Sequence, residues 1–384
     1  MDIKLFCEML KDKHFCNLEK MKYKYGAHFD EFMKNLAALY YKELPISDFS
    51  GNRIVFVENY STVSQSTVKI LLKNRSSYYA IKVAEDEILA TSAIENIDFS
   101  RDSVRNILKG YAPKDEQESR ILGIKKGLEF IADVTNRITE ENLYKLYMMT
   151  VGDFLEGDDR LKEGAFYRHD TVYVVGSRVE HSGVDHKKIP ELIKSLIAFA
   201  NEKDNINDLT KAAILHFYFA YIHPYFDGNG RTARLFHLWF LVQRGYQSAL
   251  FIPFSRLIEK SRKAYYDAFT AVEENQKHSN RVDVTPFVIY FIEKVYNEMS
   301  SFGTDTLAVY DEAIKNGSLT EKEKALWQFV LSNYGTDEFS TKQLERDFGN
   351  AAYATIRSFV LKAEELGLLV STKYSTKRKY RIAE

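Results

Sequence analysis

The chain has 384 residues and a formal net charge of −1, with 45% hydrophobic and 28% charged residues. This length predicts two or three domains rather than one. Because positive and negative charges balance, the composition excludes a protein whose whole surface attracts nucleic acid or an acidic membrane, and a nucleic-acid role would need a local basic patch.

The N-terminus and the cysteines limit the cellular context. The first residues mix acidic and basic side chains too early for a secretory signal peptide, and the apolar runs are broken well short of a membrane-spanning length. Cys7 and Cys16 are the only cysteines, which is too few for a disulfide framework or a metal site made of cysteines alone. We therefore expect a cytoplasmic protein with reduced thiols and no membrane partner.

The hydrophobic pattern predicts a mainly α-helical protein. Residues 1–50 are expected to be helical, with an apolar stripe formed by Phe29, Phe32, Met33, Leu36 and Leu39. Two β-branched runs, 53–58 and 67–73, are expected to be short strands or irregular structure. Further helices are expected over 85–96, 102–110, 115–132, 139–149, 190–201, 208–222, 231–245, 255–275 and 285–299.

A short β run interrupts these helices. Tyr167-Arg-His-Asp-Thr-Val-Tyr-Val-Val-Gly176 has the composition of a hairpin arm and ends in glycine. An isolated hairpin in a helical protein has no sheet to join. We expect it to be either a surface decoration or a device that pairs with a strand from another chain.

The composition changes again near the C-terminus. Residues 301–319 have few bulky apolar side chains and are expected to be a linker. Thr320-Glu-Lys-Glu323 and Ser340-Thr-Lys-Gln343 are capping boxes that begin helices, a third helix covers about 351–366, and two strands follow around a basic turn. Three helices and a hairpin over 320–384 predict a winged helix-turn-helix domain.

The predicted winged helix carries basic side chains on its third helix and around its wing. They are Arg357, Lys362, Lys373, Lys377, Arg378, Lys379 and Arg381. Such residues could contact DNA phosphates, but nearby acidic residues (Glu345, Asp347, Glu364 and Glu365) offset their charge. Both DNA and a protein partner therefore stay open for this unit.

The reactive side chains concentrate in one loop between two strongly apolar helices. This loop is His223-Pro-Tyr-Phe-Asp-Gly-Asn-Gly-Arg-Thr-Ala-Arg234. Gly228 and Gly230 let the backbone approach a ligand closely, and the helix N-terminus that follows makes an anion nest for phosphate oxygens. Arg231 and Arg234 add two cations on nearly the same side.

The acidic group and the imidazole of the loop complete this pattern. Asp227 beside a phosphate nest repels the anion unless a cation intervenes, which predicts Mg²⁺ between them. His223 can take a proton near neutral pH and serve as a general base. Each residue alone is more often a structural or solvated group, but together they predict phosphoryl or nucleotidyl transfer.

The same loop resembles the signature of the Fic (filamentation induced by cAMP) family, His-x-Phe-x-Asp/Glu-Gly-Asn-Gly-Arg-x-x-Arg. Tyr225 stands where the family has phenylalanine. The helices on either side fit the same fold, so we expect a Fic-type helical catalytic domain over 85–300, with the β run as a hairpin flap. Residues 1–84 are expected to be a helical and mixed N-terminal region.

The resemblance implies a Mg²⁺-dependent transfer of AMP from ATP to a Ser, Thr or Tyr hydroxyl of a target protein. His223 would deprotonate the hydroxyl, whose oxygen would attack the α-phosphate while pyrophosphate leaves. Asp227 would hold Mg²⁺, and Arg234 would hold the γ-phosphate. The nucleotide-binding residues implied by the loop are Asp227, Gly228, Asn229, Gly230, Arg231 and Arg234.

Three further stretches are similar to parts of the family. Thr91-Ser-Ala-Ile-Glu-Asn96 resembles the inhibitory motif Ser/Thr-x-x-x-Glu-Gly/Asn, which implies that Glu95 pairs with Arg234 and blocks placement of the γ-phosphate. The flap residues, which would also contact the nucleotide and on which the target would dock as an added strand, are Val172, Tyr173, Val174 and Val175. Tyr265, Tyr266 and Glu273 lie where the family lines its nucleoside pocket, and asparagine is more usual at position 273.

Other readings of the site remain open from the sequence. The same residues could remove AMP from a target, with Glu95 positioning water, or the chain could be a DNA-associated regulator whose site only senses nucleotide. A donor other than ATP, such as another nucleotide or a phosphocholine donor, and a homodimeric assembly are further alternatives. The target protein and its modified residue have no signature in the sequence.

Overall fold

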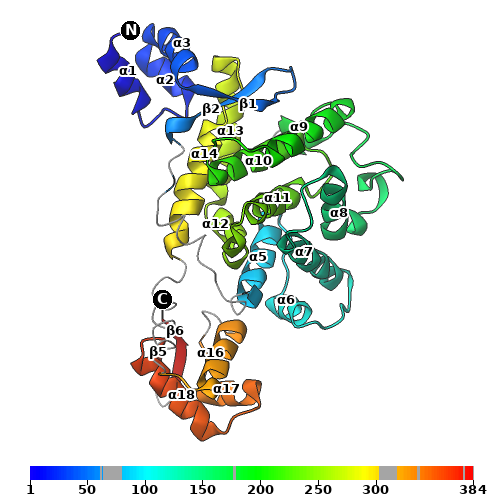
Figure 1. The fold of residues 1–384 in the computed structure, drawn as a ribbon, viewed down its shortest axis with the longest axis vertical. Helices are drawn as coiled ribbons and strands as arrows, with labels where there is room; N and C mark the ends of the chain where they lie inside the picture. The colour runs from blue at the N-terminus through cyan, green and yellow to red at the C-terminus, as the bar shows by residue number, and fades with distance from the viewer. Residues whose placement is uncertain are drawn as a thin grey trace.

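The computed structural model describes residues 1–60, 63, 80–175, 179–301, 318–334, 338–374 and 377–383. Over these residues the protein is mainly α-helical, as expected, with three separate two-stranded antiparallel sheets. Figure 1 shows a large helical body and a smaller C-terminal group of helices and strands below it. No helix in the described ranges is both long and apolar enough to span a bilayer.

The N-terminal part contains three helices and a hairpin. Their bounds are α1 (Ile3–Leu10), α2 (Leu18–Tyr25), α3 (His28–Leu39), β1 (Tyr41–Ser47) and β2 (Arg53–Val57). The expectation of helix throughout 1–50 is wrong at β1, because Pro45 disfavours a helix interior and β2 pairs with this segment.

Residues of β2 also attach this hairpin to the rest of the molecule. The Val55 amide donates to Val282 O, and the Val55 carbonyl accepts from Val284 N.

The apolar stripe predicted over residues 29–39 is buried at Phe29, Phe32 and Leu36. Leu39 is 71% exposed, so its predicted burial is wrong. The β-branched run 67–73 lies outside the described residues.

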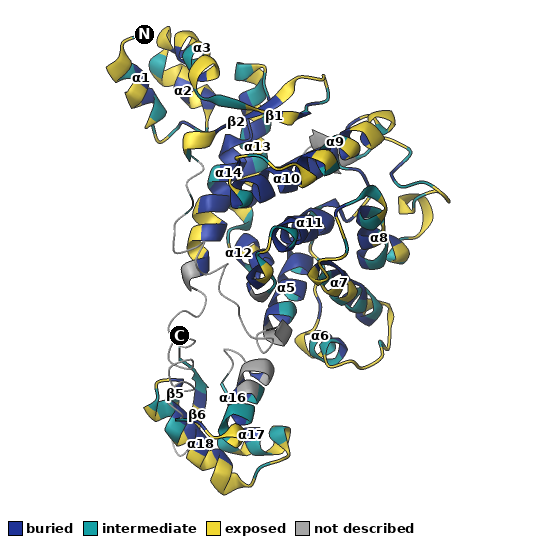
Figure 2. Cartoon of the chain, in the orientation of Figure 1, coloured by how far each residue is buried: buried dark blue, intermediate teal, exposed yellow. Residues whose placement is uncertain are grey.

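Two central helices supply much of the main hydrophobic core. Helices α10 (Asp208–Ile222) and α11 (Asn229–Gln243) are buried at nearly every position, and Figure 2 shows both in dark blue. All-round apolar character predicts this central placement. The helices packed around them are α5 (Ala80–Ile94), α6 (Arg101–Leu108), α7 (Glu116–Ala132), α8 (Glu140–Thr150) and α9 (Ile189–Asn201).

The helix predicted over 255–275 is two helices, α12 (Phe254–Lys260) and α13 (Arg262–Ser279). Ser261 separates them, and its hydroxyl bonds to Leu257 O at 2.8 Å, which competes with the helical hydrogen-bond ladder. The next predicted helix, 285–299, is helical throughout but changes type. The α-helix α14 (Thr285–Tyr290) continues as a π-helix over Phe291–Tyr296 and a 3₁₀ turn over Asn297–Ser301.

The remaining elements are short. One hairpin consists of β3 (Tyr173–Val175) and β4 (Val179–Ser182), so the predicted strand over 167–176 is confirmed only in its second half. The 3₁₀ turns are Glu58–Tyr60, Gly152–Phe154, Gly157–Asp159, His186–Lys188 and Gln247–Phe251.

The C-terminal group has its own hydrophobic core around Trp327. Its elements are α16 (Glu321–Asn333), α17 (Thr341–Phe348), α18 (Tyr353–Glu365), β5 (Leu369–Tyr374) and β6 (Lys377–Ile382). The predicted capping box at Thr320 is confirmed, because Thr320 Oγ1 accepts from Glu323 N and Thr320 N donates to the Glu323 carboxylate. Helix α16 contacts α5 of the larger body.

Candidate functional site

The loop between α10 and α11 is held in one conformation by its own residues. His223 ends α10 with φ 54° and ψ 62°, a left-handed conformation that is uncommon outside glycine. Gly228 has φ 78°, and a Cβ there would also overlap the side chain of Val151. Asn229 closes the loop, because its side chain accepts from Tyr225 N at 3.0 Å and donates to Tyr225 O at 2.9 Å.

His223 is fixed through its main chain and one ring nitrogen. The His223 carbonyl accepts from Arg168 Nε at 2.8 Å, and His223 Nδ1 lies 3.3 Å from Ala220 O. A proton on Nδ1 that points to this carbonyl places the imidazole lone pair on Nε2. The ring lines the neighbouring cavity, so Nε2 is the nitrogen suited to accept a proton from a ligand.

Arg168 is a functional candidate that the sequence did not reveal. It is 2% exposed, and besides His223 O it donates to Asp170 O at 2.5 Å and to Val184 O. One guanidinium thus ties the loop to both sides of the hairpin base. Burial lowers the pKa of Arg168. In sequence this arginine has no mark that separates it from a solvated surface residue.

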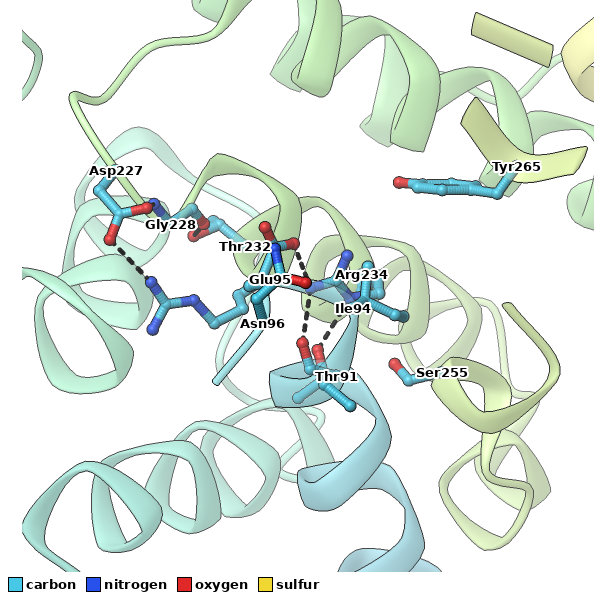
Figure 3. Close-up of polar contacts among 12 residues, drawn as sticks. Thr91, Ile94, Glu95, Asn96, Asp227, Gly228, Thr232, Arg234, Ser255 and Tyr265 are labelled. Carbon is cyan, nitrogen blue, oxygen red and sulfur yellow. Dashed lines mark hydrogen bonds and ion pairs between the residues drawn. The ribbon is translucent and has the colours of Figure 1, made fainter. Parts of the chain in front are cut away.

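Arg234 and Glu95 form the ion pair that the resemblance implied. Arg234 Nη2 lies 2.7 Å from Glu95 Oε1. The same guanidinium also donates twice to Thr91: Nε bonds to the Thr91 hydroxyl at 2.8 Å, and Nη2 bonds to the Thr91 carbonyl at 3.0 Å. Figure 3 shows these contacts between the end of α5 and α11. Burial lowers the pKa of Arg234 and the adjacent Glu95 charge raises it, with a net rise above the usual value.

The Glu95 carboxylate lies against the first turn of α11. A Cβ placed on Gly230 would overlap Glu95 Oε1, so the two groups are in direct contact and leave no room for a phosphate oxygen between them. The N-terminus of a helix attracts an anion. Glu95 therefore supplies from within the chain the negative charge that a bound phosphate would otherwise bring.

The two arginines of the loop point to different partners. Arg231 Nη2 bonds to Asp227 Oδ2 at 3.0 Å, whereas Arg234 turns to Glu95 and Thr91. The two guanidinium groups therefore bind separate carboxylates in this structure, and their joint use on one ligand stays a prediction.

Asp227 is the carboxylate that the loop itself carries beside the nest. Its side chain is 55% exposed, and its Oδ1 accepts from Gly228 N at 2.5 Å. Within the described ranges no cluster of three or more His, Cys, Asp or Glu side chains could hold a metal. A single exposed carboxylate beside a phosphate nest still fits Mg²⁺, which commonly binds one or two carboxylates together with substrate phosphates.

The end of α5 that carries Glu95 is held by α13. Arg262 donates from Nη1 to Ala93 O at 3.2 Å and from Nη2 to Asn96 Oδ1 at 2.9 Å. Asn96 has φ 59°, a left-handed conformation that ends a helix. Glu95 lies between these two contacts, one to the backbone of Ala93 and one to the side chain of Asn96.

Acidic residues near the start of α5 anchor the rest of the helix. Glu87 is 4% exposed and accepts from Ser255 N at 2.8 Å and from the Ser255 hydroxyl, so it caps the beginning of α12. Burial raises the pKa of Glu87. The preceding Glu85 bonds to Arg101 and Arg105 on α6, each at 3.0 Å.

A cavity of about 180 Å³ opens beside the loop. Its lining brings together Glu95, Ala220, Tyr221, His223, Asn229, Gly230, Tyr265, Tyr266, Phe269, Thr270 and Glu273. The predicted base, nest and nucleoside-pocket residues therefore share one space. Tyr265 is 3% exposed and its hydroxyl lies 2.9 Å from His216 Nε2 behind the cavity, and Figure 3 places it across the site from Asp227.

The hairpin lies next to the loop through its base. Gly183 N donates to Val172 O, and Tyr173, Val174 and Val175 pair with the opposite strand up to Ser182. The side chains of 173–175 are outside the described structure. The structure therefore describes the strand of the predicted flap and places it beside His223 through Arg168. The contacts of its side chains with a nucleotide stay a prediction.

Tyr225, which replaces the phenylalanine of the signature, is fully buried. Its ring stacks on Tyr147 with centroids 3.5 Å apart, but its hydroxyl has no hydrogen-bond partner among the described residues. Burial raises the pKa of Tyr225 well above its ordinary value. A buried tyrosine hydroxyl usually has a hydrogen-bond partner, and that of Tyr225 is an exception among the described residues.

We predict that Tyr225→Phe raises the free energy of unfolding by about 1 kcal/mol, since it removes a buried hydroxyl without a partner. Tyr296→Phe is the matched control, because its hydroxyl donates to Leu209 O at 2.7 Å, and it should lower stability by about 1 kcal/mol. Urea unfolding measures both. Equal losses in the two variants would show that the Tyr225 hydroxyl is bonded.

The comparisons with known proteins agree with this geometry. Residues 137–241, from just before α8 to α11, match the Fic/DOC family. "Protein adenylyltransferase Fic" of Drosophila ananassae is 24% identical over 245 residues, which cover 61% of this chain and 43% of that protein. The protein of the same name from Aedes aegypti is 26% identical over 231 residues, which cover 56% of this chain and 42% of that protein.

The chain thus spans less than half the length of these two relatives. Among solved structures, a Fic family protein from Desulfovibrio desulfuricans G20 superposes with a TM-score of 0.51 at 19% sequence identity. That superposition covers 84% of this chain and 97% of the other. At this identity the likeness establishes a common fold.

Proposed function

We propose that this chain, which carries a Fic/DOC family domain over residues 137–241, is a protein adenylyltransferase that moves AMP from ATP to a hydroxyl of a target protein. The observation that carries the proposal is the shared cavity, whose wall contains His223, Asn229 and Gly230. A general base and an anion-binding helix N-terminus on one cavity suit nucleotidyl transfer. The printed names of the two insect relatives support the same activity.

In the proposed reaction, His223 Nε2 accepts the proton of a Ser, Thr or Tyr hydroxyl. The hydroxyl oxygen forms a bond to the α-phosphorus, and the bond from that phosphorus to the bridging oxygen breaks, so pyrophosphate leaves. Arg168 fixes His223 through its carbonyl, which keeps the imidazole in position for in-line attack. The strand Tyr173–Val175 is where the target backbone would pair.

Mg²⁺, when bound, would neutralise phosphate charge and favour departure of pyrophosphate. Asp227 is the residue that would hold it, with phosphate oxygens and water as the other ligands. This role requires Asp227 to exchange its contact with Arg231 for the metal. Arg231 would then become available for the phosphates, as its place at the start of α11 suggests.

We also propose that the structure represents a self-inhibited state. Arg234 would bind the γ-phosphate, but Glu95 holds that arginine at 2.7 Å. The Glu95 charge beside Gly230 also repels an incoming phosphate. ATP and Glu95 are therefore alternative partners of Arg234.

Incubation with two forms of labelled ATP tests the proposed activity. Label at the α-phosphate should enter the chain or an added target, and label at the γ-phosphate should not. Incorporation from the γ-position instead would assign phosphoryl transfer. If neither label is incorporated, even in the Glu95→Gly variant, the proposal of a transferase is overturned. If wild type removes AMP from a modified target faster than Glu95→Gly does, the site catalyses the reverse reaction.

Arg262→Ala is predicted to raise self-labelling about two- to tenfold, because it removes one bond to the Ala93 carbonyl and one to the Asn96 side chain. These bonds lie on either side of Glu95 and are each worth about 1 kcal/mol. The rise should be smaller than for Glu95→Gly, since Glu95 itself remains. Lys263→Ala is the control, because Lys263 is exposed and pairs with Asp267 on the outer face of α13. Identical labelling of the Arg262 and Lys263 variants would remove Arg262 from the inhibitory device.

The C-terminal group is proposed to be a winged helix. Its order of helices α16, α17 and α18 followed by the hairpin β5–β6 suits that fold. Basic residues of β6 lie close to acidic partners, with Arg378 3.6 Å from Glu364 and Lys379 3.8 Å from Glu338. If the protein binds duplex DNA with an affinity that falls as salt is added, and the Arg378→Ala variant loses this binding, DNA is the partner of the C-terminal group.

A further inference from the structure

Helix α5, which leads into Glu95, belongs to a small group of helices with a hydrophobic cluster of its own. The buried members come from α5, α6, α7 and the segment between α5 and α6, and they are Ile88, Phe99, Val104, Ile107, Ile121 and Ile124. This cluster is separate from the main core, to which α5 contributes Ile94. Helices that share a separate core can shift against their neighbours as one body.

Ion pairs join α5 and α6 within this group. Glu85 bonds to Arg101 and Arg105 on α6, each at 3.0 Å, so a shift of one helix carries the other with it. We call α5, α6 and the residues between them the inhibitory unit. Because Glu95 follows α5 directly, the position of this unit sets the position of the Glu95 carboxylate relative to Arg234.

The C-terminal group lies against the inhibitory unit at the end away from Arg234. Helix α16 contacts α5; in Figure 1 it lies below the lower end of α5, whereas Figure 3 shows the other end of α5 beside α11. The charges of the two parts also interact. Burial raises the pKa of Asp347 on α17 and its hydrogen bonds within the C-terminal group lower it, and the charge of Lys109 lowers it further, with a net fall.

Lys109 is the exposed residue that ends α6. The C-terminal group therefore has a packing contact with one helix of the inhibitory unit and a charge attraction to the other. We infer that the C-terminal group is a regulatory domain that holds the inhibitory unit in place, and so controls how readily Arg234 exchanges Glu95 for phosphate. This inference rests on the proposed function for the meaning of the Glu95–Arg234 pair.

The contact and the Glu95–Arg234 pair occur in the same state, so under this inference loss of either weakens the other. A partner that binds the C-terminal group and draws it away from α5 would raise activity. A partner that binds the C-terminal group while it contacts α5 would lower activity. The C-terminal group would thus report the presence of its partner to a site that it does not itself line.

A charge reversal in the full chain tests the inference. Lys109→Glu places a second negative charge near Asp347 and weakens the contact, so self-labelling from ATP should rise about two- to fivefold, as for loss of an exposed ion pair. The rise should fade at high salt, because exposed charges are screened. Lys114→Glu is the matched control, since Lys114 is exposed in the loop after α6, and it should label at the wild-type rate.

A second variant separates the contact from a local effect on α6, since an acidic residue at the end of a helix destabilises that helix. Asp347→Asn removes the charge on the C-terminal group. Adding it to Lys109→Glu should return labelling to the rate of Asp347→Asn alone. If Lys109→Glu raises labelling equally with and without Asp347→Asn, or does not raise it, the inference is overturned.

The proposed activity can fail separately from this inference. Calorimetric titration with ATP and Mg²⁺, in chains that carry His223→Ala, needs no catalysis. If Lys109→Glu tightens ATP binding two- to fivefold and Asp347→Asn cancels the gain, but no variant incorporates label, the transferase proposal is wrong and the regulatory role stands. If Glu95→Gly labels strongly while Lys109→Glu and Lys114→Glu both match wild type, the transferase stands and the regulatory role is wrong.

Discussion

Glu95→Gly is expected to raise self-labelling from ATP at least tenfold over wild type. The bond between Arg234 Nη2 and Glu95 Oε1, at 2.7 Å, is a charge-assisted contact of about 1.5–3 kcal/mol. A nucleotide that needs Arg234 must displace it, so removing it favours the productive state by roughly 10- to 150-fold. Since Glu95 lies just after α5, which ends at Ile94, glycine there costs little helix stability.

Two companion variants isolate the cause of this activation. Glu95→Gln keeps the size of the side chain and removes its charge, so partial activation is expected if electrostatic competition dominates. Asp98→Gly changes a nearby exposed acidic residue and should leave labelling at the wild-type rate. Equal labelling by wild type, Glu95→Gly and Asp98→Gly would contradict self-inhibition, even if transfer itself is observed.

His223→Ala, made in the activated Glu95→Gly chain, is expected to lower the rate of AMP incorporation by about 10²- to 10⁴-fold, the range for loss of a general base. ATP binding should change little, because in the proposed complex the α11 N-terminus and its arginines, rather than His223, bind the phosphates. Single-turnover incorporation measures the rate, and calorimetric titration measures the affinity.

The matched control for this prediction is His28→Ala, an exposed histidine at the first residue of α3, which should keep the full rate. A His223→Ala chain that labels at the rate of the His28→Ala chain would exclude His223 as the base. A parallel loss of ATP affinity and rate would instead assign His223 to nucleotide binding.

The place of the loop between two buried helices could be predicted from the sequence, because both helices are apolar on nearly every face. The residues from His223 to Arg234 are neighbours in the chain, so their shared position needed no knowledge of packing. The pairing of Glu95 with Arg234 was expected only from the family resemblance. Nothing in the periodicity of α5 marks Glu95 apart from other acidic residues of that helix.

The two missed arginines depend on contacts between residues far apart in the chain. Arg168 meets a carbonyl 55 residues away, and Arg262 meets one 169 residues away, so their roles come from the fold rather than from sequence spacing. Strand β1 was predicted as helix because local pattern alone does not reveal its partner β2. Arg231, in contrast, bonds to Asp227 only four residues away, a spacing at which helical side chains meet. The acceptor of Arg234, Glu95, is 139 residues away.

The most direct test of the account is the intact mass of the full chain with Glu95→Gly after incubation with ATP and Mg²⁺. We predict a species heavier by one AMP group, located on a Ser, Thr or Tyr residue by peptide fragmentation and missing when His223→Ala is added. An unmodified chain, together with no modified protein after incubation with cell extract, would contradict adenylyl transfer. A mass gain of one phosphoryl group would contradict it as well, and would assign transfer of the γ-phosphate.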